Sequence, residues 1–365
     1  MKKQTMSEAQ QHLMHLQVPP GIETLNRFAA GFQQFTILEA AMDLGIFAFL
    51  AEHGPCERKE IAEGCGILGM LLRPLLSCLE DMGLLLQDND FYSNSSIAED
   101  FLLTTSPLYQ GEWLHNIRQH SHWTDLVTAL QRTEPKKSGT GGNGPTASFI
   151  DGLGQRAVRG ELQAVVEKIA DWEGFASARK MLDIGGGHGL YSIALCQENH
   201  ALQATILDRP NVLEVTARNI ENFHLEGRCS LMEGDICAGN FGQGYDIVLI
   251  SHLLYKFRKN LEPIFAMVRQ CLNPGGLLVT NHWFCAKGCV PEKDSVTELA
   301  KALQSFGHPL CHEEEFHKLL AANGMNPLAM QIVPTHFGPS RLIMAVRTDD
   351  KKGVQEQPQS CSCCC

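Results

Sequence analysis

The residues with the clearest chemical potential form a glycine-rich stretch that reads Asp-Ile-Gly-Gly-Gly-His-Gly. Gly185, Gly187 and Gly189 permit a tight turn and let a ligand lie against bare backbone, at the amino terminus of the next helix. Because residue 190 is leucine, the stretch does not meet the dinucleotide-binding fingerprint Gly-x-Gly-x-x-Gly. Asp183, just before the loop, suits a cationic amino-acid group and would repel a pyrophosphate. The stretch therefore predicts a site for a positively charged cofactor, with a tight turn without a ligand as the alternative.

Further acidic residues follow the next two apolar runs. Asp208 is placed to accept hydrogen bonds from two ribose hydroxyls, with a helix N-cap before Pro210 as the alternative. Gly234, Asp235 and Ile236 can bind an adenine, the acid accepting from its amino group and the apolar side chain packing on its ring. A turn-stabilising role is the alternative for Asp235.

The second half of the chain alternates short apolar runs with helical stretches, which is typical of a parallel α/β sheet. The predicted strands are Lys180–Ile184, Ala204–Leu207, Cys229–Met232, Ile247–Ile250, Leu277–Thr280, Leu328–Val333 and Leu342–Val346. They predict a Rossmann-like, seven-stranded α/β domain whose strand ends carry the acids above. Ser251, directly after the fourth run, belongs to the same predicted cofactor site.

The first half is mostly helical. Phe28, Phe32 and Phe35 recur at helical spacing, and a helix over Leu68–Met82 precedes two short strands at Leu84–Leu86 and Phe91–Tyr92. This order predicts a winged-helix unit. The would-be recognition helix carries one Arg against two acids, which favours a dimerisation or lid role over DNA binding. We predict these parts: an N-terminal segment 1–20, a winged-helix-like dimerisation domain 21–133, a flexible linker 134–148, a catalytic domain 149–348 and a tail 349–365.

Composition narrows the class of protein. The 365 residues include 30 Lys plus Arg against 41 Asp plus Glu, a formal charge of -11 that disfavours nucleic-acid binding. A polar stretch follows the basic first residues, and no window approaches the roughly 20 apolar residues of a membrane span, so we expect a cytoplasmic protein without a secretory signal. Ten of the 14 cysteines are scattered and read as buried thiols, Cys285 and Cys289 being a weak metal pair. The other four, Cys361 and Cys363 to Cys365, form a tail that could capture a soft metal or metalloid, be lipidated or oxidised, or have no role.

The combination of motifs resembles the class I S-adenosylmethionine-dependent methyltransferases, and within them the small-molecule O-methyltransferases typified by the caffeate and acetylserotonin enzymes. The motifs that carry the resemblance, besides the glycine loop, are Leu44-Gly45-Ile46-Phe47, Gly54-Pro55, Glu60-Ile61-Ala62, the helix and hairpin from Leu75 to Leu86, Gly234-Asp235, Asn273-Pro274-Gly275-Gly276 and Glu313-Glu314-Glu315-Phe316. The resemblance covers about residues 20–347. It implies a homodimer through the N-terminal domain, S-adenosyl-L-methionine as cofactor, a small-molecule acceptor and no metal ion. It also implies that His308 and His312 lie on the segment that faces the substrate.

The resembled family's catalytic pair is replaced in this sequence. In the family a histidine after the fourth strand removes the acceptor's proton, and a carboxylate after the fifth strand orients it. Tyr255 and His282 stand at these positions, whereas His252 falls three residues earlier, where the family varies. A tyrosine of pKa near 10 is a poor base unless a neighbour such as His282 lowers its pKa or accepts its proton.

Several alternatives follow from this replacement. The acceptor is acidic or a thiolate, or it is carbon with Tyr255 shuttling a proton, or the protein has lost methylation and binds the cofactor in a regulatory dimer. A pocket-wall role for Tyr255 and a core role for His282 are the structural alternatives. We predict methyl transfer to a small molecule, oxygen being favoured by the family.

Overall fold

The structure is a computed structural model that describes Met14 and residues 20–119, 122–131, 145–239, 241–285, 295–304, 310 and 312–348. Contacts within the chain divide it into two compact units, Met1–Gly111 and Glu112–Cys365. The predicted boundary lay near residue 133, so α7 (Gly111–Gln119) and α8 (Leu126–Gln131) fall almost wholly in the second unit. A hydrogen bond explains part of this difference: Trp113 N–H of α7 donates to Gln155 Oε1 at 3.0 Å, which ties α7 to a helix of the second unit.

The first unit consists of short helices around a small antiparallel sheet, in the predicted order. Its elements are α2 (Ile22–Asp43), α3 (Ile46–His53), β1 (Cys56–Glu57), α4 (Arg58–Gly64), α5 (Gly69–Asp81), β2 (Leu85–Asp88), β3 (Phe91–Asn94) and α6 (Ser96–Phe101). Strand β3 lies between β1 and β2, and Leu85 pairs with Asn94. Leu72, Leu76 and Leu79 of α5 are fully buried because they share one face of the helix.

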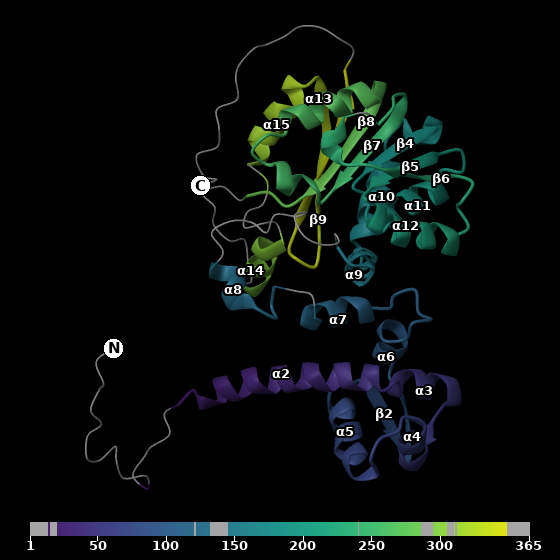
Figure 1. The fold of residues 1–365 in the computed structure, drawn as a ribbon, viewed down its shortest axis with the longest axis vertical. Helices are drawn as coiled ribbons and strands as arrows, with labels where there is room; N and C mark the ends of the chain where they lie inside the picture. The colour runs from purple at the N-terminus through teal and green to yellow at the C-terminus, as the bar shows by residue number, and fades with distance from the viewer. Residues whose placement is uncertain are drawn as a thin grey trace. The chain divides into compact units, whose positions relative to one another are not determined.

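The second unit has helices on both faces of one large sheet (Figure 1). Besides α7 and α8, its helices are α9 (Ala147–Ala157), α10 (Glu161–Ala170), α11 (Leu190–Glu198), α12 (Pro210–Asn222), α13 (Glu262–Cys271), α14 (Ser295–Gln304) and α15 (Glu313–Ala322), with short 3₁₀ turns at Phe175–Ser177, Ile236–Ala238 and Leu254–Phe257. Its strands are β4 (Lys180–Ile184), β5 (Gln203–Asp208), β6 (Cys229–Glu233), β7 (Tyr245–Ser251), β8 (Leu272–His282), β9 (Met325–Val333) and β10 (Ser340–Arg347). All seven predicted strands are confirmed.

The strand order is β6-β5-β4-β7-β8-β10-β9. Strands β4 to β8 pair in parallel, and β10 pairs antiparallel with both β8 and β9. The chain adds β5 and β6 on one side of β4 and then β7 and β8 on the other, so the loops after β4, β5 and β7 come together at one edge of the sheet, formed by the carboxyl ends of these strands. Such an edge is where open α/β sheets bind their ligands.

Alternate residues of the central strands pack into two separate cores. Ile247 and Leu249 of β7 belong to the core that includes residues of α10 and α11, whereas Val248 and Ile250 belong to the core that includes residues of α13 and α15. All four side chains are fully buried, which explains why the strand reads as a continuous apolar run. A strand fixed on both faces gives the loop at its end a rigid base.

None of the described helices is by itself long and apolar enough to cross a membrane. Two bent pairs, α2 with α3 and α4 with α5, reach the length and composition only together.

Candidate active site

The glycine loop connects β4 to α11 in the way that the sequence predicted. Gly185, Gly187 and Gly189 have φ values of 71°, 57° and 74°, in the left-handed region that favours glycine. A Cβ on Gly185 would lie 2.7 Å from Leu253 Cδ2, so the loop after β7 packs directly on the glycine loop. A Cβ on Gly187 would meet nothing closer than 3.9 Å, so this part of the backbone is bare.

Two predicted acids hold this loop. Asp208 Oδ2 accepts a hydrogen bond from Gly187 N–H at 3.0 Å, and its Oδ1 accepts from Arg209 N–H at 2.8 Å. The helix N-cap alternative for Asp208 is wrong, because Arg209 occupies the N-cap position of α12. Asp183 is buried and accepts from Ser192 Oγ at 2.8 Å, and burial raises its pKa to about 7. Both carboxyl groups therefore contact the loop or its following helix.

The loop after β6 forms a short turn. The carboxylate of Asp235 is exposed and accepts from Cys237 N–H at 2.8 Å, while Ile236 is buried in the core. Gly234 N–H donates to the carbonyl oxygen of Asp208 at 3.1 Å, which joins this turn to the end of β5. The structure thus shows the turn-stabilising contact of Asp235, and its adenine contact stays a prediction.

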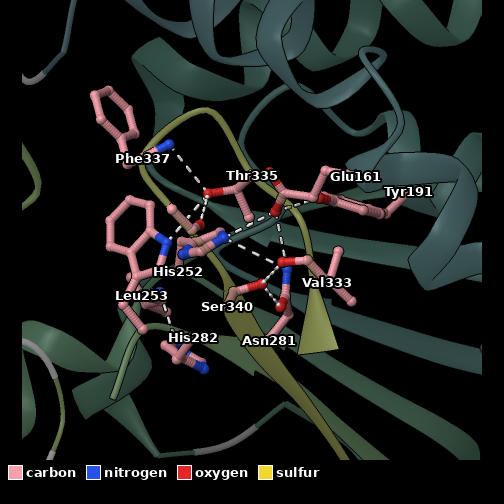
Figure 2. A network of polar contacts seen from close by, with 12 residues as sticks. Glu161, Tyr191, His252, Leu253, Asn281, His282, Val333, Thr335, Phe337 and Ser340 are labelled. Atoms are coloured by element: carbon pink, nitrogen blue, oxygen red, sulfur yellow. Dashed lines mark hydrogen bonds and ion pairs between the residues drawn. The ribbon is translucent and has the colours of Figure 1, made fainter. Parts of the chain in front are cut away.

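A buried polar network lies where β7 ends, and its centre is Glu161, the first residue of α10 (Figure 2). Glu161 Oε1 contacts His252 Nε2 at 2.8 Å and accepts from Asn281 Nδ2 at 2.9 Å and from Tyr191 Oη at 3.0 Å. His252 Nδ1 lies 2.7 Å from Tyr255 Oη. Because the Glu161 carboxylate is an acceptor, His252 Nε2 carries a proton and donates it to Glu161; Asn281 Nδ2, which lies 3.4 Å from the same nitrogen, is also a donor and hydrogen-bonds to Glu161.

The electrostatics of Glu161 follow from these contacts. Burial alone would raise its pKa, but attraction to His252 and the hydrogen bonds from His252 and Tyr191 outweigh burial and lower the pKa below its ordinary value. Glu161 is therefore ionised at neutral pH. His252 has a φ of 50°, uncommon for a residue other than glycine, and its side chain remains 24% exposed.

The predicted pair of Tyr255 and His282 does not form a hydrogen bond. Their rings pack edge to face with centroids 5.3 Å apart, while Tyr255 Oη accepts from Trp283 N–H at 2.8 Å. Burial raises the pKa of Tyr255 well above 10. His282 Nε2 accepts from the N–H groups of Leu253 and Leu254 at 3.2 and 3.1 Å, and burial lowers its pKa well below the ordinary value.

Two consequences follow for the predicted chemistry. His282 cannot lower the pKa of Tyr255, because it is neutral and uses Nε2 to hold the turn after β7. The sequence interpretation gave His252 no role and so missed the histidine that links Glu161 to Tyr255 in the network. The position of His252 directly after Ser251, the last residue of β7, could have marked it as a site residue, because Asp208 was predicted from its place at the end of a strand. Glu161, 91 residues before His252, carried no such signal.

The remaining predictions fall partly outside the described residues. His308, Cys289 and the tail Cys361–Cys365 lie there, whereas His312 occupies the N-cap position of α15 without a side-chain capping hydrogen bond, and its Nδ1 lies 3.2 Å from the carbonyl oxygen of Cys285. Across the described ranges, no three His, Cys, Asp or Glu side chains are grouped as a metal site. None of the described cysteines forms a disulfide bond; Cys56, Cys196, Cys229 and Cys271 are buried as predicted, whereas Cys237 is exposed, so the prediction of a buried thiol is wrong there.

A hollow of about 320 Å³ lies at the opposite edge of the sheet, beside the starts of β4, β5 and β6. Its lining includes Lys180, Thr205 and Arg228. It is separate from the network, because parallel strands carry the glycine loop and His252 at their other ends.

Comparisons with known proteins agree with this arrangement. The chain matches the O-methyltransferase domain over residues 146–326 and the O-methyltransferase dimerisation domain over residues 26–104. It is 29% identical over 269 residues to the N,N-dimethyltransferase OxyT of Streptomyces rimosus, covering 70% of this chain and 76% of the relative. It is 26% identical over 266 residues to the 3-hydroxy-5-methyl-1-naphthoate 3-O-methyltransferase of Streptomyces sahachiroi, covering 70% and 75%.

The fold is similar to that of human N-acetylserotonin methyltransferase, solved in complex with S-adenosylmethionine. The TM-score is 0.70 at 20% identity, over 91% of this chain and 99% of the human chain. The two domain matches together span most of the chain, in the order that the structure shows. The chain therefore belongs to the O-methyltransferase family and is a methyltransferase with S-adenosylmethionine as its cofactor.

Proposed function

We propose that this enzyme methylates a hydroxyl oxygen of a small molecule, with Glu161 taking the hydroxyl proton and His252 positioning Glu161. The observation that carries the proposal is the 2.8 Å contact between Glu161 and His252 where β7 ends. Leu253, the next residue, packs on Gly185 of the glycine loop. Because Leu253 directly follows His252 in the chain, Glu161 and His252 lie beside the glycine loop, which the cofactor is expected to contact.

The residues at the loop fit S-adenosylmethionine. The open backbone at Gly187 leaves room for the cofactor, and Asp183 and Asp208 supply carboxylates for its ammonium group and its ribose. Gly185, Gly189, Gly234, Asp235, Ile236 and Ser251 complete the proposed site. When bound, the cofactor supplies a methyl group on a sulfonium. No residue here needs to activate that methyl group, so the task of the protein is to align the acceptor and remove its proton.

Glu161 has the properties of the proton acceptor. Its Oε1 is engaged with three side chains, whereas no described residue donates to its Oε2. Its lowered pKa keeps the carboxylate ionised at neutral pH. Both ring nitrogens of His252 are already in hydrogen bonds, so the role of the histidine is to hold the Glu161 carboxylate in its orientation. A carboxylate is a weak base, which favours an acidic hydroxyl such as a phenol.

Incubation with methyl-labelled S-adenosylmethionine and cell extract tests the reaction. We expect label in a small product, whose analysis identifies oxygen, nitrogen, sulfur or carbon as the acceptor atom. Cofactor binding without any transfer would contradict the proposal and support the alternative, a non-catalytic regulatory dimer on the same fold.

Glu161→Gln tests the proton acceptor, because the amide keeps the shape but cannot take the proton. We expect turnover to fall about 10²-fold or more with unchanged affinity for S-adenosylhomocysteine, measured by calorimetry. Glu167→Gln, an exposed residue on the same helix, is the matched control and should keep full turnover. Full turnover in Glu161→Gln would remove Glu161 from the chemistry.

A further inference from the structure

The hydroxyl of Tyr255 connects His252 to the backbone that follows β8. Its oxygen lies 2.7 Å from His252 Nδ1 and accepts a hydrogen bond from Trp283 N–H at 2.8 Å. These are its two hydrogen-bond partners within the part of the chain that the structure describes, and the residue is only 4% exposed. The single proton of the hydroxyl must therefore be placed within these two contacts.

Only one of the two partners can accept that proton. Burial raises the pKa of Tyr255 well above 10, so the hydroxyl keeps its proton at neutral pH. A backbone N–H only donates, so Trp283 is not an acceptor. If His252 Nδ1 also carried a proton, the hydroxyl would face two donors and its own proton would be buried without an acceptor, which is destabilising. The hydroxyl therefore donates to Nδ1.

The surroundings hold Tyr255 in the orientation that this hydrogen bond needs. Its ring stacks on that of Trp283, with centroids 5.5 Å apart and an interplanar angle of 15°. His282 packs against the ring edge to face, and its Nε2 accepts from the N–H groups of the two residues directly before Tyr255. These contacts leave the hydroxyl little freedom to turn away from His252.

We infer that Tyr255 is a positioning residue, whose hydroxyl keeps Nδ1 of His252 free of a proton, so that the ring has a single N–H, directed at Glu161. This inference rests on the proposed function and adds a residue to it. Without the hydroxyl, the carboxylate 2.8 Å from Nε2 would favour a second proton on the ring, because a positive imidazolium is attracted to it. An imidazolium would in turn stabilise the ionised Glu161 and make it a poorer proton acceptor. Tyr255 thus acts on Glu161 through His252.

Other ionisable groups face this pair from the elements packed around it. They are His282 of β8 beside His252, and Arg156 of α9, His188 of the glycine loop and Tyr191 of α11 near Glu161. Among the described residues, Tyr255 alone hydrogen-bonds to Nδ1 of His252. Removing its hydroxyl therefore changes the environment of that nitrogen and leaves the other groups in place.

The proton positions on His252 test the inference on the full chain loaded with S-adenosylhomocysteine. Two-bond proton–nitrogen NMR spectra of protein labelled with nitrogen-15 histidine distinguish a ring nitrogen that carries a proton from one that does not. The signals of His252 are those that disappear in His252→Asn. At pH 7.5 we expect wild-type His252 to carry a proton on Nε2 alone, and we expect Nδ1 to gain a proton in Tyr255→Phe.

Tyr245→Phe is the matched control, because Tyr245 is also a buried tyrosine of the second unit and its hydroxyl donates to the carbonyl oxygen of Phe241 at 2.9 Å. It should leave the signals of His252 unchanged. A melting curve confirms that each variant is folded. A proton on Nδ1 in the wild type, or a Tyr255→Phe variant whose Nδ1 stays without a proton, would overturn the inference. The wild-type spectrum is a test by itself, whatever the stability of the variant.

Kinetics with an acceptor from the label assay separate this role from a general structural one. Tyr255→Phe should lower kcat at neutral pH by about 10- to 100-fold and change KM less than about threefold. The acid limb of kcat should move to lower pH, because an imidazolium lowers the pKa of Glu161. Loss of His252 itself moves the limb to higher pH, so an unmoved or raised limb in Tyr255→Phe would contradict the inference. The spectra need no methyl transfer, so failure of the proposed reaction is seen separately in the label assay.

Discussion

A single carboxylate, Glu161, shows how this site solves the problem of a buried charge. Removing a carboxylate from water destabilises its ionised form, yet three side chains here donate to or contact one of its oxygens. His252 contributes the largest opposing effect, so Glu161 remains ionised. The fold thereby keeps the Glu161 carboxylate ionised at neutral pH although little of it is exposed to water.

Replacing His252 by Asn should change the pH dependence of turnover. Attraction to His252 lowers the pKa of Glu161, and its loss lets burial raise that pKa. Since Glu161 must be ionised to take a proton, the acid limb of kcat should move to higher pH than in the wild type. Rates measured across pH 4–8 with an acceptor from the label assay check the shift.

His224→Asn is the control for this measurement, because His224 is an exposed histidine with a φ of 55°, close to the 50° of His252. Its pH profile should match the wild type. An acid limb that stays in place in His252→Asn would contradict the positioning role, even if the overall rate fell.

At the scale of elements, the ends of β4, β5 and β7 determine the site. All three strands were predictable because each is an apolar run bounded by glycine or polar residues, a signal that is local in sequence. The glycine loop was predictable for the same reason. The interaction of the loops was not, since the contact of Leu253 with Gly185 depends on β4 and β7 being neighbours in the sheet.

Gly185→Ala should disrupt this junction. The left-handed φ of 71° costs an alanine about 1–2 kcal/mol, and its Cβ would collide with Leu253 Cδ2 at 2.7 Å. We expect a lower melting temperature and at least tenfold weaker binding of S-adenosylhomocysteine, measured by thermal denaturation and calorimetry.

The control for this substitution is Gly227→Ala, because a Cβ on Gly227 meets nothing within 4 Å. It should leave both measurements unchanged. Wild-type affinity in Gly185→Ala would show that the junction is not coupled to cofactor binding.

At the scale of the whole molecule, the first unit exposes a series of large apolar residues. On α2, Leu25, Phe28 and Phe32 are 62%, 70% and 73% exposed. Residues that recur at three- and four-residue steps form one face of a helix, and a large apolar surface of this kind indicates an interface. Together with the match to a dimerisation domain, it supports a homodimer formed through this unit.

We predict that the double substitution Phe28→Asp and Phe32→Asp prevents dimer formation through α2, because the introduced carboxylates would be buried in the interface. Sedimentation velocity measures the change. Phe223→Asp, at a 47% exposed position of the second unit, should leave the dimer intact. A wild type that sediments as a monomer, or a double variant that remains dimeric, would contradict this assignment of α2.

The sequence by itself determined the seven strands, the glycine loop and the acids at the strand ends, because each depends on residues that are near one another in the chain. It could not assign the proton acceptor. Glu161 and His252 are 91 residues apart, and only the packing of α10 against the end of β7 brings them to 2.8 Å. The sequence also could not show that Tyr255 and His282 do not act as a catalytic pair. Their pKa values and hydrogen-bond partners depend on the surroundings that folding creates.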